Sequence, residues 1–235
     1  MRQLTFFILL FFCLPTKSLA QLDSLFRGTI QGYIVPFVWV DNNPRLRVGL
    51  EYHGYDRMAY SLEIGFGNNF LNQGKLKRVV WGQEYSFFEL RPEIKWFVKE
   101  NVKLPWYLRG AILVPNYFAV EGFYQEMHDQ LENSDFDPKS SDIEIAYDEA
   151  SFKKIKIGAH AKVGFKMLLW KKVVIDIYEG IGLAYRKISY TNLVNPVLTE
   201  DRNGEWWSES YKNEGAYFLF QVSLGVRVGY VFGKV

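Results

Sequence analysis

The sequence has a single cysteine, no long hydrophobic run and no excess of charge of either sign. Cys13 is the only cysteine among 235 residues, so a scaffold held by intrachain disulfides is excluded. No later stretch approaches the ~18 uninterrupted apolar residues of a membrane-spanning helix. Because 28 basic residues nearly balance 26 acidic ones, no net field attracts the chain to nucleic acid. Hydrophobic residues at 49% and aromatic residues at 17% nevertheless predict a folded protein.

The first twenty residues have the layout of a cleaved secretory signal peptide. Arg2 precedes the apolar run 6–14, and the small residues Ser18 and Ala20 precede the expected cleavage point. Lipidation at Cys13 is not expected, because bulky phenylalanines precede it. We therefore expect a signal peptide at 1–20, a short lead at 21–27 and one domain at 28–235. The exported chain would carry 26 basic and 26 acidic residues.

The rest of the chain alternates between apolar and polar residues, as β-strands do. In the run 216–232 every even position from Phe218 to Phe232 is apolar, whereas the odd positions include Gln221, Ser223 and Arg227. This run is far longer than the ~5 to 6 residues of an ordinary globular strand. Similar alternation predicts eight strands, at 29–40, 46–53, 58–67, 87–98, 106–120, 154–169, 173–186 and 216–232. Pro36, in the first, lacks the N–H that a ladder bond needs.

The connections between these strands differ in length in a regular order. The second, fourth and sixth are short, whereas the third, fifth and seventh are long, at about 67–83, 124–152 and 192–215. Short turns at one rim and long loops at the other are typical of outer-membrane barrels with periplasmic termini. The sequence therefore predicts an all-β fold, an eight-stranded antiparallel up-and-down transmembrane barrel in the bacterial outer membrane. An extra hairpin within 124–152 is left open.

One face of the expected strands collects charged side chains, which would point into the lumen. They are Arg47, Glu51, Glu63, Glu89, Arg91, Glu93, Lys95, Arg109, Lys156, His160, Lys162, Lys166, Asp176, Arg186 and Arg227. An eight-stranded lumen is just wide enough for side chains to meet across it. Because an unpaired buried charge is costly, opposite charges at this density predict a structural plug of salt bridges. An ion or proton path is the alternative interpretation.

The other face is apolar, and aromatic residues cluster where the two membrane interfaces would lie. Trp96, Trp106, Trp170, Tyr230 and Phe232 are expected near the short-turn rim, and Trp81, Tyr117, Phe118, Tyr185 and Phe218 near the long-loop rim. Glu179 does not fit, because its parity points it into lipid. Either a bulge near Gly180 turns it inward or it lies close to an interface.

A secreted lipocalin-like carrier of an apolar ligand is the rival interpretation of the alternation. Such a barrel has the same number of strands but places its apolar face inside and its charges outside. Alternation alone does not distinguish the two orientations. The strand length, the signal peptide and the aromatic girdles favour the membrane barrel.

Several short motifs resemble those of small bacterial outer-membrane barrel families of unknown function. These motifs are 47–52 (RVGLEY), 60–65 (YSLEIG), 90–97 (LRPEIKWF), 180–185 (GIGLAY) and 229–232 (GYVF). The architecture is similar to that of OmpX and the OmpA transmembrane domain. The resemblance covers most of the mature chain and implies a fold and a membrane location, but it transfers no catalytic residue. The chain departs from it at Glu179 and in the long acidic fifth loop.

No catalytic, cofactor or metal site is predicted. His160 has cationic neighbours on its face, His53 lies near a tight turn, and His128 lies in the fifth loop, so each is interpreted as structural. That loop carries nine acids and one lysine, which predicts a solvated surface, with bridging of divalent cations to lipopolysaccharide phosphates as an alternative. Lys75, Lys77 and Arg78 offer those phosphates a direct contact.

The expected function is non-enzymatic and belongs to the cell envelope. We expect either a role in envelope integrity or binding of an extracellular or envelope protein partner through the long loops. The barrel would be monomeric and would be surrounded by outer-membrane lipid and lipopolysaccharide. A lipid A-modifying outer-membrane enzyme is a further alternative, although Glu179, Ser189 and His128 have no spacing that unites them.

Overall fold

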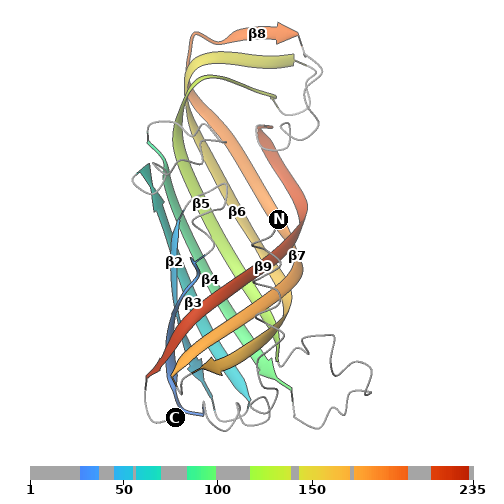
Figure 1. Ribbon diagram of the computed structural model, residues 1–235. Helices are drawn as coiled ribbons and strands as arrows, with labels where there is room; N and C mark the ends of the chain where they lie inside the picture. The colour runs from blue at the N-terminus through green and yellow to red at the C-terminus, as the bar shows by residue number, and fades with distance from the viewer. Residues whose placement is uncertain are drawn as a thin grey trace, which may run out of the picture.

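The computed structural model describes residues 27–36, 45–54, 57–69, 84–98, 117–138, 143–169, 172–200 and 213–232. Within these ranges lie nine strands of one antiparallel sheet (Figure 1). They are β1 (Ile30–Ile34), β2 (Leu46–His53), β3 (Met58–Asn68), β4 (Ser86–Phe97), β5 (Tyr117–Phe136), β6 (Ile143–Leu169), β7 (Val173–Val194), β8 (Val197–Glu200) and β9 (Gly215–Phe232). The expected signal peptide lies outside the described residues.

Eight of the strands close into a ring. The order around it is β5-β4-β3-β2-β1-β9-β7-β6, and a β5–β6 pairing completes the circuit. The short strand β8 lies outside the ring and pairs with the start of β6. The predicted all-β antiparallel class is therefore confirmed. No helix with the length and hydrophobicity needed to cross a membrane occurs in the described part of the chain.

Several strands lie where the alternation predicts them. β2 has the predicted bounds, β3 and β9 differ from prediction by one residue at one end, and β4 differs by one residue at each end. β1 stops at Ile34, two residues before Pro36, which has no N–H to donate to a neighbouring strand. The other strand proline, Pro92, pairs with Leu62 of β3, whereas the β4–β5 register omits it. Prolines thus occur where the ladder ends or is interrupted.

The predicted fifth loop, 124–152, is wrong for most of its length. β5 continues to Phe136 instead of ending at 120, and β6 begins at Ile143 instead of 154. The two strands keep one register from Tyr117 opposite Gly164 to Phe136 opposite Ile145, with a pair missing only at Asn133, whose φ is positive. Residues 106–116 of the strand predicted there lie outside the described part. Figure 1 shows that β5 and β6 rise well above β2–β4, with β8 at the top.

An aromatic cluster makes this tall extension a folded element. The Phe136 ring stacks on Tyr190 of β7 at a centroid distance of 4.2 Å, and Tyr147 and Phe152 of β6 pack around that pair. Met127 and Ile188 belong to the same buried cluster. Burial raises the pKa of Tyr190, because the ionised phenolate would lose its hydration. The extension therefore has its own apolar core. Burial of this core offsets the conformational entropy that is lost when the long hairpin is ordered.

Inside the ring, aromatic side chains lie over glycines of the neighbouring strand. In each of four cases the two residues are direct cross-strand partners, and a Cβ on the glycine would overlap the ring. The pairs are Tyr33 with Gly49, Tyr117 with Gly164, Phe123 with Gly158, and Tyr178 with Gly225. A bulky ring fits in this narrow interior only where its partner has no side chain. Such pairs also fix the register, because a slip of one residue would bring a Cβ under the ring.

Glu179 points outward. β7 keeps one continuous register with β6 from Val173 to Thr191 and with β9 from Val173 to Ile188, so no bulge occurs near Gly180. The side chain is exposed, as are those of Ile181 and Leu183 on the same face. The alternative in which a bulge turns Glu179 inward is therefore wrong, and its carboxylate lies on the apolar outer face.

The glycine pairs predict that an added methyl group destabilises the protein at a paired glycine but not at an unpaired one. Gly164→Ala places a Cβ within the Tyr117 ring, so we expect a loss of about 1–3 kcal/mol through overpacking. Gly122→Ala is the matched control, because its Cβ would meet only Pro92 at an ordinary 3.8 Å. Thermal unfolding of the purified variants, followed by circular dichroism, checks this. Equal midpoints for the two variants would contradict the proposed role of the pairs.

Candidate functional site

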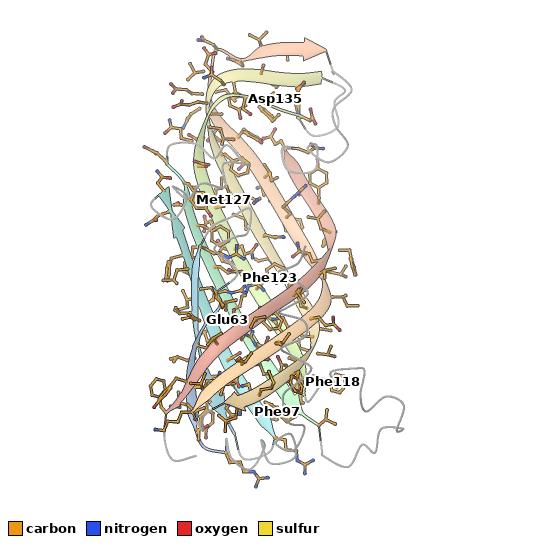
Figure 2. The ribbon with its side chains drawn as sticks, in the orientation of Figure 1. Glu63, Phe97, Phe118, Phe123, Met127 and Asp135 are labelled. Carbon is orange, nitrogen blue, oxygen red and sulfur yellow. The ribbon has the colours of Figure 1, made fainter. Side chains whose placement is uncertain are left out.

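The ring separates charged from apolar side chains across its wall. Inward positions hold eight buried cations and seven buried carboxylates among the described residues. The outer face is apolar and exposed, as at Leu50, Phe118 and Val120, and the exposed fraction reaches 82% at Phe218. The charged interior is therefore the strongest candidate for a functional site. Figure 2 shows side chains filling the space between the strands from the level of Phe97 upward past Glu63 and Phe123.

Arg227 of β9 is the centre of this interior. Its Nε donates to Glu63 Oε1 at 2.6 Å, and one terminal nitrogen donates to Glu93 Oε1 at 2.8 Å and to Asp176 Oδ2 at 3.3 Å. The guanidinium also lies over the Tyr178 ring, 4.5 Å from its centroid. One side chain of β9 thus binds acids of β3, β4 and β7. Of these three strands, only β7 is a neighbour of β9 in the ring.

A second group of charges lies nearer the short turns. Lys95 Nζ lies 2.7 Å from Glu51 Oε2 and 2.6 Å from Asp176 Oδ2, and Lys166 donates to the other oxygen of Glu51. His53 Nε2 lies 2.7 Å from Glu51. The Tyr117 hydroxyl donates to Asp176 at 2.6 Å, so this carboxylate has partners from three strands.

A third group lies on the other side of Arg227, toward the long loops. Arg45 Nε donates to Glu89 at 2.7 Å, and Arg91 joins Glu89 to Glu121, which it reaches at 2.7 Å. Lys162 donates to Glu121 and, at 2.9 Å, to Glu93. Because Arg227 also binds Glu93, this group is continuous with the first. The ion pairs therefore form one connected network across the lumen.

Most of the predicted lumen residues belong to this network. Those that the structure buries inside the ring are Arg47, Glu51, Glu63, Glu89, Arg91, Glu93, Lys95, His160, Lys162, Lys166, Asp176, Arg186 and Arg227. Lys156 is half-buried and pairs with Arg186, nearer to the long loops than His160. Arg109 lies outside the described residues. The expectation that opposite charges meet across the lumen holds for the described part of the chain.

Sequence reasoning left three titratable members of the network out of the lumen set, namely Arg45, His53 and Glu121. Arg45 and His53 share the inward parity of β2, so extending that parity by one residue would have included Arg45. Glu121 was missed because the predicted strand ended at 120. The tyrosines Tyr33 and Tyr178 were also missed, although Tyr33 donates to Glu63 and Tyr178 accepts from Arg47.

Each of the three histidines lies beside a single carboxylate in the described part of the chain. His160 Nδ1 lies 3.1 Å from Glu121, and its ring stacks on Phe123 at 4.7 Å. His128 lies on the outer side of β5 with Glu126, which also binds Lys153 at 2.8 Å, whereas Asp129 faces the interior. No three His, Cys, Asp or Glu residues in the described ranges gather as a metal site. Lys75, Lys77 and Arg78 lie outside those ranges.

The expected aromatic girdles are described only in part. Trp96, Tyr185, Phe218, Tyr230 and Phe232 are exposed on the outer face. Trp81, Trp106 and Trp170 lie outside the described residues. Two further placements at the long-loop rim are wrong, because Tyr117 and Phe118 pair with Phe97 and Trp96 at the short-turn end of β5. Figure 2 shows Phe118 close to the level of Phe97. Tyr117 is fully buried in the lumen, on the face that its parity predicts. Both errors follow from the strand predicted too early in the chain.

Comparison with known proteins finds no family model, no curated protein and no solved structure that matches the chain.

The network predicts that removing its central cation is costly. Arg227→Met leaves Glu63, Glu93 and Asp176 each without one of its partners, and we expect a loss of about 3–5 kcal/mol. Lys187→Met is the control, because it removes the same charge from an exposed position, where the expected change is within about 0.5 kcal/mol. Chemical denaturation of both variants checks this. Similar losses for both would show that Arg227 is not the centre of the network.

Proposed function

We propose that the chain is an outer-membrane β-barrel protein with a plugged lumen, acting without catalysis in envelope integrity or in partner binding. The observation that carries this proposal is the orientation of the two faces, with paired charges inside and exposed apolar side chains outside. A soluble carrier of an apolar ligand needs the opposite orientation. Because lipid tails satisfy an apolar outer face and water does not, a membrane is the environment that fits this ring.

Strand length supports the same proposal. A transmembrane strand needs about 9–11 residues when it is tilted. β3 has 11 residues and β4 has 12, and their outward positions include Leu62, Ile64, Phe66, Phe88 and Ile94. On β5 and β6 the apolar outer face ends where Glu126, His128 and Lys153 begin. We place the long-loop interface at that level.

The plug favours a structural role for the interior over an ion path. A conducting path requires mobile water or groups that exchange partners along the lumen. Here each carboxylate of the network contacts at least one cation, and Lys95, Lys166 and Arg227 are fully buried. We therefore propose that binding to partners takes place on the extension beyond the ring and not in the lumen.

The extension formed by the upper parts of β5, β6 and β7 with β8 is the best candidate for partner binding. It projects beyond the ring and is kept rigid by the cluster around Tyr190 (Figure 1). Its tip exposes the apolar residues Val194, Val197 and Leu198 close to the acidic side chain of Asp148, which accepts from Asn195 at 2.7 Å. A rigid platform with apolar and acidic groups is suited to an extracellular or envelope protein partner.

The membrane barrel predicts a heat-dependent gel shift and an electrically silent protein. In dodecyl sulfate the unboiled outer-membrane fraction should contain a band of altered mobility that boiling abolishes, because a closed ring resists the detergent until it is heated. In planar bilayers the refolded protein should give no single channels. An unshifted protein in the soluble periplasmic fraction would refute the membrane barrel. Clear single channels would refute the plug and favour the interpretation of the interior as an ion path.

The extension is predicted to be dispensable for folding of the ring. Asp129 and Phe152 are cross-strand partners, so replacing residues 130–151 with Asn-Gly closes a short hairpin in the same register. The shortened protein should retain the heat-dependent shift, because the ion-pair network lies below the excised part. A pull-down from surface extracts should then lose whichever partner the full chain captures. Loss of the shift itself would show that the extension supports the ring.

A further inference from the structure

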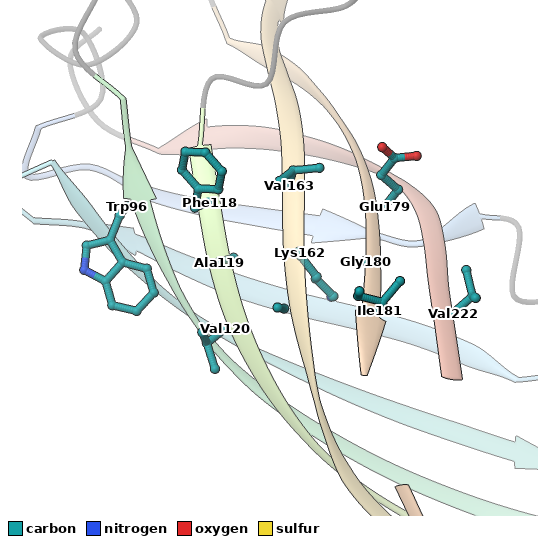
Figure 3. Close-up of a pocket in the computed structure, with 11 residues that line it drawn as sticks. Trp96, Phe118, Ala119, Val120, Lys162, Val163, Glu179, Gly180, Ile181 and Val222 are labelled. Carbon is teal, nitrogen blue, oxygen red and sulfur yellow. The ribbon is translucent and has the colours of Figure 1, made fainter. Parts of the chain in front are cut away.

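A shallow depression crosses the outer wall of the ring over β5, β6 and β7 (Figure 3). Its volume is about 620 Å³, within the roughly 300–1,000 Å³ of ordinary ligand clefts. Ala161 and Val163 of β6 provide short outward side chains in the middle of the depression. Larger ones flank it, with Phe118 and Val120 on one side and Ile181 and Val222 on the other. The surface is apolar enough, and long enough, to receive a hydrocarbon chain.

Glu179 is the one carboxylate that lines this depression. Figure 3 shows it on the opposite side of Val163 from Phe118. The register agrees, because Val163 pairs with both Phe118 and Glu179. Within the described ranges Glu179 has no hydrogen bond and no ion pair. It differs in this respect from the buried network carboxylates, each of which contacts a cation.

A carboxylate facing hydrocarbon is stabilised when a cation approaches it. The nearest cation of the depression, Lys162, points inward and is bound to Glu93 and Glu121. Because no cation of the described ranges pairs with Glu179, we look for its complement outside the ring. An amphiphile with a positively charged headgroup and an acyl chain satisfies both the carboxylate and the apolar trough.

The geometry further selects the kind of headgroup. Phe118 lies two strands from Glu179, at about 10 Å, so the described residues form no cage of aromatic rings around the carboxylate, as quaternary ammonium recognition requires. A primary ammonium donates charge-assisted hydrogen bonds to a carboxylate, whereas a quaternary ammonium has no N–H to donate.

We propose that this depression binds a phospholipid with a primary ammonium headgroup, of the phosphatidylethanolamine class. The ammonium pairs with Glu179, and an acyl chain lies over Ala161 and Val163. The inference rests on the proposed membrane location, because only a protein embedded in lipid presents this wall to phospholipid.

Native mass spectrometry of the full chain in detergent tests the site with three probe lipids of identical acyl chains. The probes are phosphatidylethanolamine, phosphatidylcholine and phosphatidylglycerol. We expect the wild type to retain phosphatidylethanolamine at least tenfold more strongly than the other two. Glu179→Gln should remove this preference. Glu126→Gln is the matched control, because Glu126 also faces outward but is already bound to Lys153. It should leave the preference unchanged.

A second variant tests the trough separately from the carboxylate. Ala161→Phe fills the depression from an exposed position without touching the network, so it should weaken retention of phosphatidylethanolamine about as much as Glu179→Gln does. Equal retention of all three lipids by the wild type, or an unchanged preference in Glu179→Gln, would overturn the proposal. A dimer that Glu179→Gln dissociates would overturn it in favour of a second copy of the chain.

The heat-dependent gel shift is recorded on the same samples. It distinguishes failure of the lipid site from failure of the membrane barrel. A protein that shifts on heating but shows no headgroup preference refutes only the lipid site. A protein that stays soluble and shows no shift refutes both the membrane barrel and the site that depends on it.

Discussion

Charge pairing in a space that excludes water is the constraint on which the ring depends. Eight cations and seven carboxylates are buried among the described residues, and a single unpaired member would cost several kcal/mol. Cross-strand hydrogen bonds join each strand only to its neighbours. The ion pairs of Arg227 instead join β9 to β3 and β4, on another part of the ring. The backbone ladder sets the diameter of the ring through strand number and stagger, and the network adds contacts between opposite parts of the wall.

The aromatic and glycine pairs make room for this network. An eight-stranded interior has little spare volume, and the rings of Tyr33, Tyr117 and Tyr178 fit only because each lies over a glycine of the adjacent strand. Each of these hydroxyls then contributes to the charged network, Tyr117 by donating to Asp176 and Tyr178 by accepting from Arg47. Packing and electrostatics thus select the same register, and a one-residue slip would cost both at once.

Much of this arrangement was predictable because alternation in a strand assigns each side chain to a face. The bounds of β2 follow from alternation, and parity alone places Glu63, Lys162 and Arg227 on the charged face of their strands. The partners of Arg227 do not, because contacts across the lumen depend on how all eight strands are staggered. The extension was missed for a different reason. Outward positions of β5 beyond 120 carry Glu126, His128 and Gln130, whose polarity is the same in a solvated loop and in a solvated strand. Only the long-range pairing with β6 distinguishes the two.

Glu179 illustrates the same constraint from the opposite side of the wall. Inside the ring the chain provides a cation for each network carboxylate, because no outside group can enter a filled lumen. On the outer face the chain need not provide one, since the surroundings can. An outward carboxylate beside a trough of small side chains is costly for an isolated ring, and the lipid that we propose would bring both a cation and a hydrocarbon chain to it. The filled interior and the outward Glu179 therefore follow from the same requirement, that a carboxylate in apolar surroundings needs a cation. Glu179, whose cation the described residues do not provide, is the place where the outer wall can bind another molecule.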